Sequence, residues 1–519
     1  MVALAVLASI NGLHNWYAYD DVSLILSNAA AHSLSALVHV WGQPYWPPGV
    51  GGALYRPLTS ALWAVEWVVG QGSPLPFHIV NIVLYAGVSL SVYGLARRLV
   101  PPSAAVIAAA LFAVHPAHVE VVANCVGQSE LLATLAVTTA TLVFLDSPSG
   151  GARSRWLIAL LYAAGILSKE SAIVLPALLL VAALTVVRDG RPWRAQLAAF
   201  RPLAFALLVA FVGCLTLRYA VIGTVLGDPG HPMLAGASLP TRLWTMLGVV
   251  TEWVRLLVWP AHLSISYNPP AIPIRSHPDG TALVGALMVA AVVWAVIVAR
   301  RRAPAIAFGL GWTALALVPV SNLLFVTGVL LAERSLFLPS VGAALAVGGV
   351  VAIVGEWRGL RVVAAVCIAA GVWRSAIRQP IWHDDHTLFA RGVIDAPRDY
   401  YTHYLWADQL FNEGRTDDAA REAGRSIDLS RGYPPALALL ADVYARDGAC
   451  DRAIPLWRRA LRVMPWLVPP RVRLAACLVR TGEYADARAV AVEGIAHGET
   501  DPALRQTIVA ADSAASRRP

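Results

Sequence analysis

Long apolar runs separated by short polar stretches fill the first three quarters of the chain and stop near residue 380. A membrane-spanning helix needs roughly 20 apolar residues. We therefore predict eleven spans, near residues 1–13, 76–95, 103–118, 129–145, 156–168, 171–187, 202–219, 281–299, 304–322, 336–354 and 360–376. The first run is short for a complete span and no signal-peptide cleavage pattern follows it, so it is either a half-span or a truncated start.

Basic residues predict the orientation of these spans. Thirteen arginines lie in the loops between alternate spans, and all of them are cytoplasmic if the N-terminus is cytoplasmic. The segment 243–259 is also apolar, but a twelfth span there would place Arg300–Arg302 on the outer side. Because the segment also contains Glu252 and Arg255, we predict that it forms an interfacial helix. Eleven spans then place the C-terminal part of the chain outside the cytoplasm.

A 34-residue repeat organises the chain after residue 380. One series of glycines and two series of alanines recur at intervals of 34 residues: Gly414, Gly448 and Gly482; Ala407, Ala441 and Ala475; Ala419, Ala453 and Ala487. This period is typical of tetratricopeptide (TPR) repeats, which are pairs of helices. We predict repeats at about 400–433, 434–467 and 468–501, a lead-in helix at 382–397 and a capping helix at 502–516. Such arrays commonly bind extended peptides on a concave surface, although this one could serve only for dimerisation or as a scaffold.

Composition separates the same two parts. The 519 residues are 57% hydrophobic and 14% charged, whereas soluble domains contain about 25% charged residues. The basic surplus lies before residue 380, in the membrane part, which argues against nucleic acid as the partner. The five cysteines show no CxxC spacing, so we expect neither a disulfide framework nor a zinc site.

Five clusters of ionisable residues lie at the outer ends of the predicted spans. Ionisable residues in or beside spans are costly, and each is a site hypothesis. The clusters are Asp20 with Asp21, Arg56 with Glu66, His115 with His118 and Glu120, Lys169 with Glu170, and Glu333 with Arg334. Their shared position predicts a polar site on the outer face.

Each cluster also has a structural explanation. Asp20 could cap a helix that begins at Val22, and His115 could simply end a span before a proline. Lys169 and Glu170 are adjacent, so they would need separate partners. Glu333 or Arg334 could form an ion pair with one of them. Coincidence is a poorer explanation for all five clusters together.

Several strings carry a resemblance to a known family. They are "YDD", "YRPLTSALWAVEW", "FHIVNIVLYAGV", "LFAVHPAHVEVVANCVGQSELLA", "ILSKES" and "AERSLFLPSVG", followed by the repeats. Together they resemble the transmembrane and TPR repeat-containing O-mannosyltransferase-like family of the GT-C membrane glycosyltransferase superfamily. The short first span and the small number of repeats depart from the family pattern. The arginine-rich composition suggests a bacterial relative.

The resemblance implies an all-α fold with two domains. Residues 1–379 would form a GT-C-like transmembrane catalytic domain of about eleven spans, and residues 380–519 an extracytoplasmic TPR α-solenoid. The expected location is a bacterial inner membrane, with the N-terminus cytoplasmic and the TPR domain periplasmic.

The implied reaction transfers a hexose, mannose in the best-known relatives, from a polyprenyl-phosphate carrier to a Ser or Thr hydroxyl of a protein. Asp20 or Asp21 would act as the general base, while its neighbour orients the acceptor, the sugar or a divalent cation. Arg56, Lys169 or Arg334 would hold the lipid phosphate. The remaining substrate-binding candidates are His115, His118, Glu120, Glu170 and Glu333. We predict no metal-ligand set and no required cofactor, and a divalent cation stays open.

Three alternatives compete with this interpretation. The chain could be a non-catalytic, membrane-anchored TPR scaffold for envelope assembly. A transporter is the weakest alternative, because residues 1–190 and 200–376 show no internal symmetry and the charges lie at span ends. Within the enzyme class, the acceptor could be a lipid-linked glycan in place of a protein.

Overall fold

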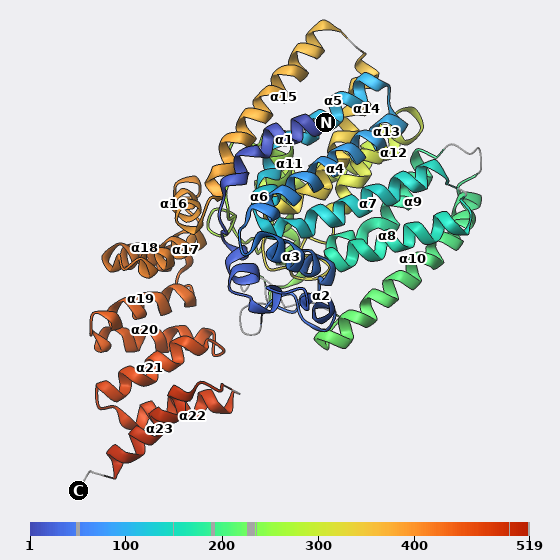
Figure 1. Ribbon diagram of the computed structural model, residues 1–519. Coiled ribbons are helices and arrows are strands. Elements are labelled where there is room, and N and C mark those ends of the chain that lie inside the picture. Colours follow the sequence, from blue (N-terminus) through green and yellow to red (C-terminus); the bar gives the residue numbers. More distant parts are fainter. Residues whose placement is uncertain are drawn as a thin grey trace. The chain divides into compact units, whose positions relative to one another are not determined.

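The computed structural model describes residues 1–47, 52–148, 150–187, 192–225, 234, 236–355, 357–497 and 499–516. Throughout these residues the regular secondary structure is helical, which confirms the all-α prediction. The chain divides into two compact units (Figure 1). Unit 1 comprises Met1–Ile265 and Ile274–Leu388, and unit 2 comprises Ser266–Pro273 and Phe389–Pro519.

A helix lies at each of the eleven apolar runs in unit 1. They are α1 (Val2–Ser9), α4 (Leu75–Leu99), α5 (Pro102–Ala113), α7 (Gln128–Asp146), α8 (Ala152–Ser168), α9 (Leu175–Thr185), α10 (Trp193–Ile222), α12 (Gly280–Arg302), α13 (Pro304–Leu317), α14 (Phe337–Val354) and α15 (Arg358–Arg378). Short helices α2 (Ala36–His39) and α6 (Val119–Ala123), the amphipathic α3 (Pro57–Gly70) and α11 (Leu239–Val258) complete the unit. These helices are consistent with a multi-pass membrane protein.

The prediction of eleven complete spans is not confirmed. Six helices of the described residues are long and apolar enough to cross a membrane: Leu75–Leu99, Cys125–Asp146, Trp193–Ile222, Gly280–Arg302, Glu333–Val354 and Arg358–Trp382. A seventh span is possible if Pro102–Ala113 and Pro116–Ala123, bent by 47°, act as one. At about 1.5 Å per residue, α1, α9 and α13 are too short to cross a hydrocarbon layer of about 30 Å.

Helices α13 and α14 form a very close contact in unit 1. A Cβ atom on Gly309 would lie 2.5 Å from the carbonyl oxygen of Gly342, and Gly342 approaches Gly309 equally closely. Small residues permit such backbone contact, which is how helices associate where the hydrophobic effect gives little help. Gly285 of α12 likewise lies against the backbone of Leu247 in α11. The interfacial position of α11 stays a prediction.

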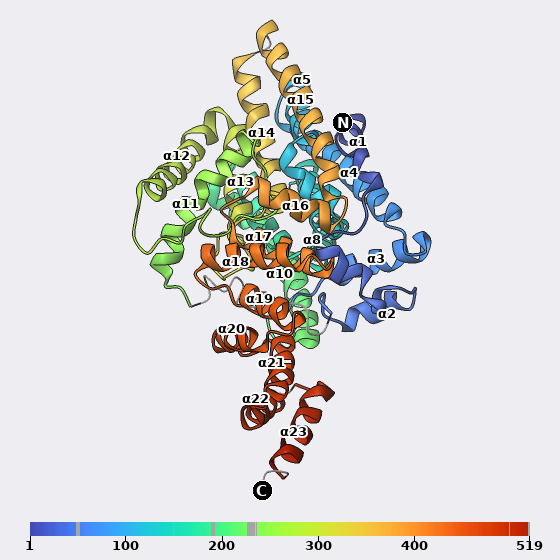
Figure 2. The same cartoon turned by 90° about the vertical axis from the view of Figure 1, so that its left-hand side faces the viewer.

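Unit 2 is a stack of helix pairs with the predicted period (Figure 2). The pairs are α17 (Tyr400–Asn412) with α18 (Thr416–Ser430), α19 (Pro434–Arg446) with α20 (Cys450–Val463), and α21 (Val468–Arg480) with α22 (Tyr484–Ala496). Helix α16 (Asp385–Asp395) precedes the pairs along the chain and α23 (Pro502–Ala515) follows them. First and second helices each recur at 34-residue steps, the step that the sequence predicts.

Small and flexible residues explain the repeat geometry. Both alanine series are fully buried, at 0% exposure, which lets neighbouring helices approach closely. Gly414, Gly448 and Gly482 adopt φ values of 81°, 82° and 80° in the turn within each pair. This left-handed conformation is favourable for glycine and costly for most other residues.

Two features of unit 2 were not predicted. Cys450 of α20 and Cys477 of α21 form a disulfide bond, which corrects the expectation from cysteine spacing. Stacking of successive repeats brings together two cysteines that no local motif connects. The segment Ser266–Pro273 also belongs to unit 2, where Asn268 N donates to Asp399 Oδ2 at 2.6 Å.

Candidate functional site

The two adjacent aspartates sit in a constrained turn. Tyr19 adopts a φ of 59°, in the left-handed region, which a bulky residue rarely occupies. Its N–H donates to Asp385 Oδ1 at 2.6 Å. Such strained conformations persist only where the surrounding structure holds them, and they are common at functional sites. The turn gives Asp20 and Asp21 different environments.

Asp21 is buried, and its carboxylate accepts hydrogen bonds from backbone N–H groups. It is 1% exposed, and its two carboxylate oxygens accept hydrogen bonds from Cys125 N at 3.1 Å and Val126 N at 2.8 Å. A longer bond comes from Ala18 N at 3.5 Å. Burial raises the pKa of Asp21 to about 7, although these N–H donors act in the opposite direction. Asp21 therefore joins its loop to the 3₁₀ turn Cys125–Gly127.

Asp20 is the accessible member of the pair. Its side chain is 23% exposed, and its Oδ2 lies 3.4 Å from Arg334 Nη1. The same Nη1 lies 3.1 Å from Glu120 Oε1, and Arg334 N donates to Glu120 Oε2 at 2.8 Å. Two carboxylates thus share one guanidinium group, an arrangement with one negative charge in excess. Asp20 therefore pairs with an arginine and does not cap the helix that begins at Val22, whose N-cap residue is Asp21.

Arg56 and Glu170 form a second group with the opposite charge balance. Arg56 donates through Nε and Nη2 to Glu170 Oε2, at 3.0 and 2.7 Å, and its guanidinium lies 4.6 Å from the ring centroid of Tyr45. Arg218 of α10 approaches the other oxygen of Glu170, with Nη1 at 3.5 Å from Oε1. Here two guanidinium groups share one carboxylate.

Lys169 connects the two groups electrostatically. It forms an ion pair with Glu130 of α7, which also accepts a hydrogen bond from Ser171 at 3.3 Å. Lys169 interacts electrostatically with both Arg56 and Arg334. The residues named so far therefore form one polar cluster in unit 1, which we call the outer cluster: Asp20, Arg56, Glu120, Glu130, Lys169, Glu170, Arg218 and Arg334.

Sequence reasoning missed two members of the outer cluster. Arg218 is a lone charge within a predicted span, and Glu130 follows closely after the span-end string "HPAHVE". Both carried the signal of an ionisable residue in an apolar helix. Their partners, Glu170 and Lys169, are distant in sequence and could not be inferred from spacing.

Both histidines predicted to bind substrate are occupied by other contacts. His118 is 2% exposed and bonds Tyr85 Oη at 3.0 Å and Ser340 Oγ at 2.9 Å. His115 bonds Leu257 O at 3.1 Å and accepts from Ala117 N at 3.3 Å. Each histidine thus ties chain segments together.

Glu333 contacts residues outside the outer cluster. It accepts from Ser264 N at 2.6 Å and lies 3.7 Å from Arg378 Nη2, with both charged side chains 1% exposed. The expected pairing of Glu333 or Arg334 with Lys169 or Glu170 is replaced by pairs with Arg378, Asp20 and Glu120.

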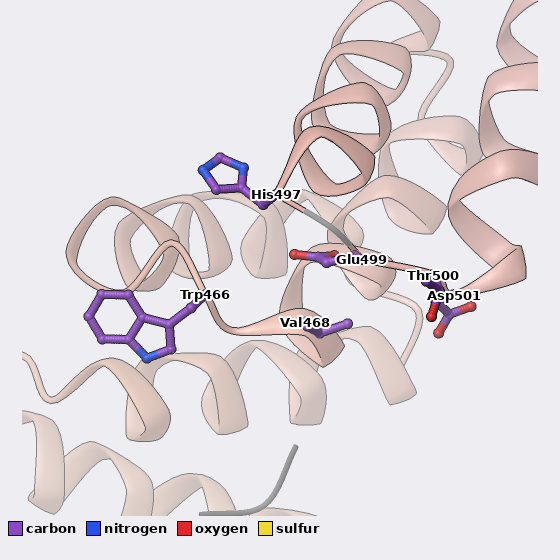
Figure 3. A pocket seen from close by; sticks show the side chains of 6 residues that line it. All are labelled: Trp466, Val468, His497, Glu499, Thr500 and Asp501. Atoms are coloured by element: carbon purple, nitrogen blue, oxygen red, sulfur yellow. The ribbon is translucent and has the colours of Figure 1, made fainter. Parts of the chain in front are cut away.

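Two further observations concern ligand binding. Among the described residues, no group of three or more His, Cys, Asp or Glu side chains could hold a metal ion. A hollow of about 530 Å³ lies in unit 2, lined by Trp466, Val468, His497, Glu499, Thr500 and Asp501 (Figure 3). Glu499 already pairs with Arg471, and Asp501 accepts from Ala503 N at the start of α23.

Comparisons with known proteins agree with the motif analysis. Residues 57–216 match the family model described as dolichyl-phosphate-mannose-protein mannosyltransferase. The protein O-mannosyl-transferase F38B6.6 of Caenorhabditis elegans is 24% identical over 449 residues, covering 83% of this chain and 62% of that protein. Human protein O-mannosyl-transferase TMTC4 is 26% identical over 468 residues, covering 78% and 62%. Drosophila melanogaster Tmtc2 is 33% identical over 288 residues, covering 52% and 30%.

These matches confirm the resemblance to the O-mannosyl-transferase family. The chain spans about 62% of the length of the first two relatives. Among solved structures, the TPR domain of P58(IPK) aligns with 13% identity and a TM-score of 0.26, covering 74% of this chain and 99% of that chain. A bacterial origin stays a prediction.

Proposed function

We propose that the chain is a membrane O-mannosyltransferase that moves a mannose from a polyprenyl-phosphate carrier to a hydroxyl group of an extracytoplasmic protein. The observation that carries the proposal is the contrast between the two aspartates, in which Asp20 is accessible beside Arg334 and Asp21 is engaged by backbone N–H groups. The names of the relatives support the sugar and the protein acceptor.

Asp20 acts as the general base in this mechanism. One of its carboxylate oxygens takes the hydroxyl proton as the acceptor oxygen bonds to the anomeric carbon. The bond between that carbon and the phosphate oxygen breaks, and its electron pair leaves with the lipid phosphate. Arg334 holds Asp20 in place and is itself held by Glu120 through its backbone N–H and its guanidinium group.

Basic residues of the outer cluster stabilise the leaving phosphate. Arg56 and Lys169 supply fixed positive charge, which counts most in a site shielded from water, while Arg334 positions Asp20. The outer cluster as a whole is neutral, because its four carboxylates balance its four cations. The protein acceptor would be presented by the repeats of unit 2, which is an analogy with other repeat arrays.

The first experiment measures transfer of radiolabelled mannose from polyprenyl-phosphate mannose in vesicles that contain the full chain. Asp20→Asn should reduce transfer about 100-fold or more, the usual contribution of a positioned base. Asp21→Asn should mainly lower the yield of folded protein. Glu252→Gln is the matched control, because Glu252 pairs with Arg255 on α11 and neither residue belongs to the outer cluster.

The outcomes separate the alternatives. Full activity of a folded Asp20→Asn variant would overturn the assignment of the base. Label that reaches lipid and not protein would keep the chemistry and discard the protein acceptor. If no donor in a panel of sugars is used by the wild type, the membrane-anchored scaffold replaces the enzyme. Repeating the assay with EDTA tests the divalent cation.

A further inference from the structure

The group formed by Arg56, Glu170 and Arg218 has a surplus of positive charge. Glu170 Oε2 accepts two bonds from Arg56, and Glu170 Oε1 lies 3.5 Å from Arg218. The arginine side chains are only 12% and 10% exposed, whereas the side chain of Glu170 is 35% exposed. A single carboxylate thus faces two largely buried cations.

Arg218 retains an unused donor. Its Nη2 donates to Ala53 O at 2.6 Å, but its buried Nε has no hydrogen-bond partner among the described residues. Arg218 is 8% exposed, so water reaches it poorly. Leaving a buried guanidinium N–H unsatisfied is costly, and a site of this kind calls for an acceptor.

Charge is distributed unevenly across the outer cluster. The Arg334 end has two carboxylates and one guanidinium, Lys169 is paired with Glu130, and the Arg218 end has two guanidinium groups and one carboxylate. A phosphodiester carries one negative charge, which matches the surplus at the Arg218 end. At the Arg334 end the same anion would meet a surplus of like charge.

The helix that carries Arg218 also presents apolar surface. Leu217 is 43% exposed and Val212 is 52% exposed on α10, a helix long and apolar enough to cross a membrane. A hydrocarbon chain attached to the anion could lie along such a face. This favours a lipid phosphate over free inorganic phosphate as the ligand.

We propose that Arg218, together with Arg56, binds the phosphate of the polyprenyl-phosphate donor, and that Glu170 sets the strength of this binding by neutralising one of the two arginines. The inference rests on the proposed function and assigns the donor phosphate to one end of the outer cluster. Asp20, at the other end of the outer cluster, then interacts with the acceptor hydroxyl and not with the phosphate. Arg218 is a substrate-binding residue that no motif pointed to.

The alternative is that the three residues only brace the fold. Arg218 connects α10 to Ala53, and Glu170 connects Arg56 to the 3₁₀ turn Glu170–Val174, which precedes α9. In that case, neutralising Glu170 would weaken the structure and could not improve the binding of an anion. The two explanations therefore predict opposite signs for Glu170→Gln.

The test measures binding of undecaprenyl phosphate, undecaprenol and inorganic phosphate to the full chain in nanodiscs. Arg218→Gln should weaken binding of undecaprenyl phosphate about tenfold or more, the value of one lost charge-assisted bond, and should leave undecaprenol unchanged. Arg218→Lys should retain most of the affinity. Glu170→Gln should bind undecaprenyl phosphate several times more tightly than the wild type. Arg201→Gln, an exposed arginine of the same helix, is the control.

Each result decides the question. Unchanged affinity in Arg218→Gln, or weaker phosphate binding in Glu170→Gln, would overturn the proposal. Equal binding of inorganic phosphate and undecaprenyl phosphate would overturn the lipid part. If Arg218→Gln fails to fold, the sign of the Glu170→Gln effect still separates the two explanations. Arg218-dependent binding without mannose transfer would instead refute the proposed function while the phosphate site stands.

Discussion

At the scale of single residues, function depends on which hydrogen bonds a side chain has left to make. Asp20 and Asp21 are chemically identical neighbours, yet the strained turn at Tyr19 leaves one accessible and the other 1% exposed. Glu66 is another buried carboxyl group, and burial raises its pKa to about 8, partly offset by a 2.8 Å bond from Gln128. A buried acid that is held by the fold serves stability, whereas an accessible one can exchange protons with a substrate.

His403 gives a pH-dependent prediction at this scale. Its Nδ1 lies 2.6 Å from Glu422 and its Nε2 lies 3.1 Å from Pro397 O, so both ring nitrogens face acceptors. Burial alone would lower the pKa of His403, but these bonds and the charge of Glu422 raise it. Because the folded pKa exceeds the unfolded value of about 6.5, the stabilisation is complete below that pH and is lost as pH rises through the folded pKa.

Thermal unfolding of wild type and His403→Gln at pH 5.5 and pH 8.5 measures this contribution. The wild type should be clearly more stable than the variant at the lower pH, and the difference should shrink at the higher pH. A difference that grows with pH would show that His403 is neutral in the folded repeat.

At the scale of elements, close contact between helices is determined by glycine. The backbones of α13 and α14 meet at Gly309 and Gly342, with no room for a side chain. Dispersion forces and the fit of the surfaces stabilise such a contact where apolar burial contributes little. The points at which helices end also affect the architecture, because α9 and α13 are too short to span the membrane alone.

The α13–α14 contact can be tested with a matched pair of variants. Gly309→Ala should destabilise the protein by about 1–3 kcal/mol, because the new methyl group overlaps the backbone of α14. Gly213→Ala on α10 has no atom within 4 Å of the new methyl group and should leave stability unchanged or slightly higher. Melting temperatures in one detergent compare the two, and equal losses would refute the packing argument.

At the scale of the whole molecule, the disulfide bond between Cys450 and Cys477 gives information about the compartment in which the repeats lie. Disulfide bonds persist in oxidising compartments and are rare in the cytosol. Cys450 and Cys477 are bonded in unit 2, whereas Cys125, Cys214 and Cys367 are free in unit 1. The bond thus provides an argument, independent of the arginine distribution, for the expected extracytoplasmic side of the repeats.

Alkylation of the cell-expressed chain tests this expectation. N-ethylmaleimide in SDS should modify Cys125, Cys214 and Cys367 at once, and Cys450 and Cys477 only after reduction. Cys450→Ser should release Cys477 for labelling and lower the stability of unit 2 by about 2–4 kcal/mol. Immediate labelling of both cysteines in the wild type would argue for a reducing compartment.

The sequence by itself determined the features that depend on local pattern. Apolar runs gave helices at all eleven places, and a 34-residue period gave the three repeats with their buried alanines. The pattern also located most of the outer cluster, including Asp20, Arg56, Lys169 and Arg334. These features are readable because hydrophobicity acts within a single helix and because a repeat is found by comparing the chain with itself.

The tertiary structure alone decided which side chains meet. Glu170 lies 48 residues before Arg218 in the chain, and Cys450 lies 27 residues before Cys477, with no motif to connect either pair. The difference between Asp20 and Asp21 likewise depends on the turn Cys125–Gly127, whose N–H groups bind one carboxylate and not the other. Which side chains become partners depends on which helices pack together. Helix packing joins residues that are far apart in sequence, so only the folded chain determines it.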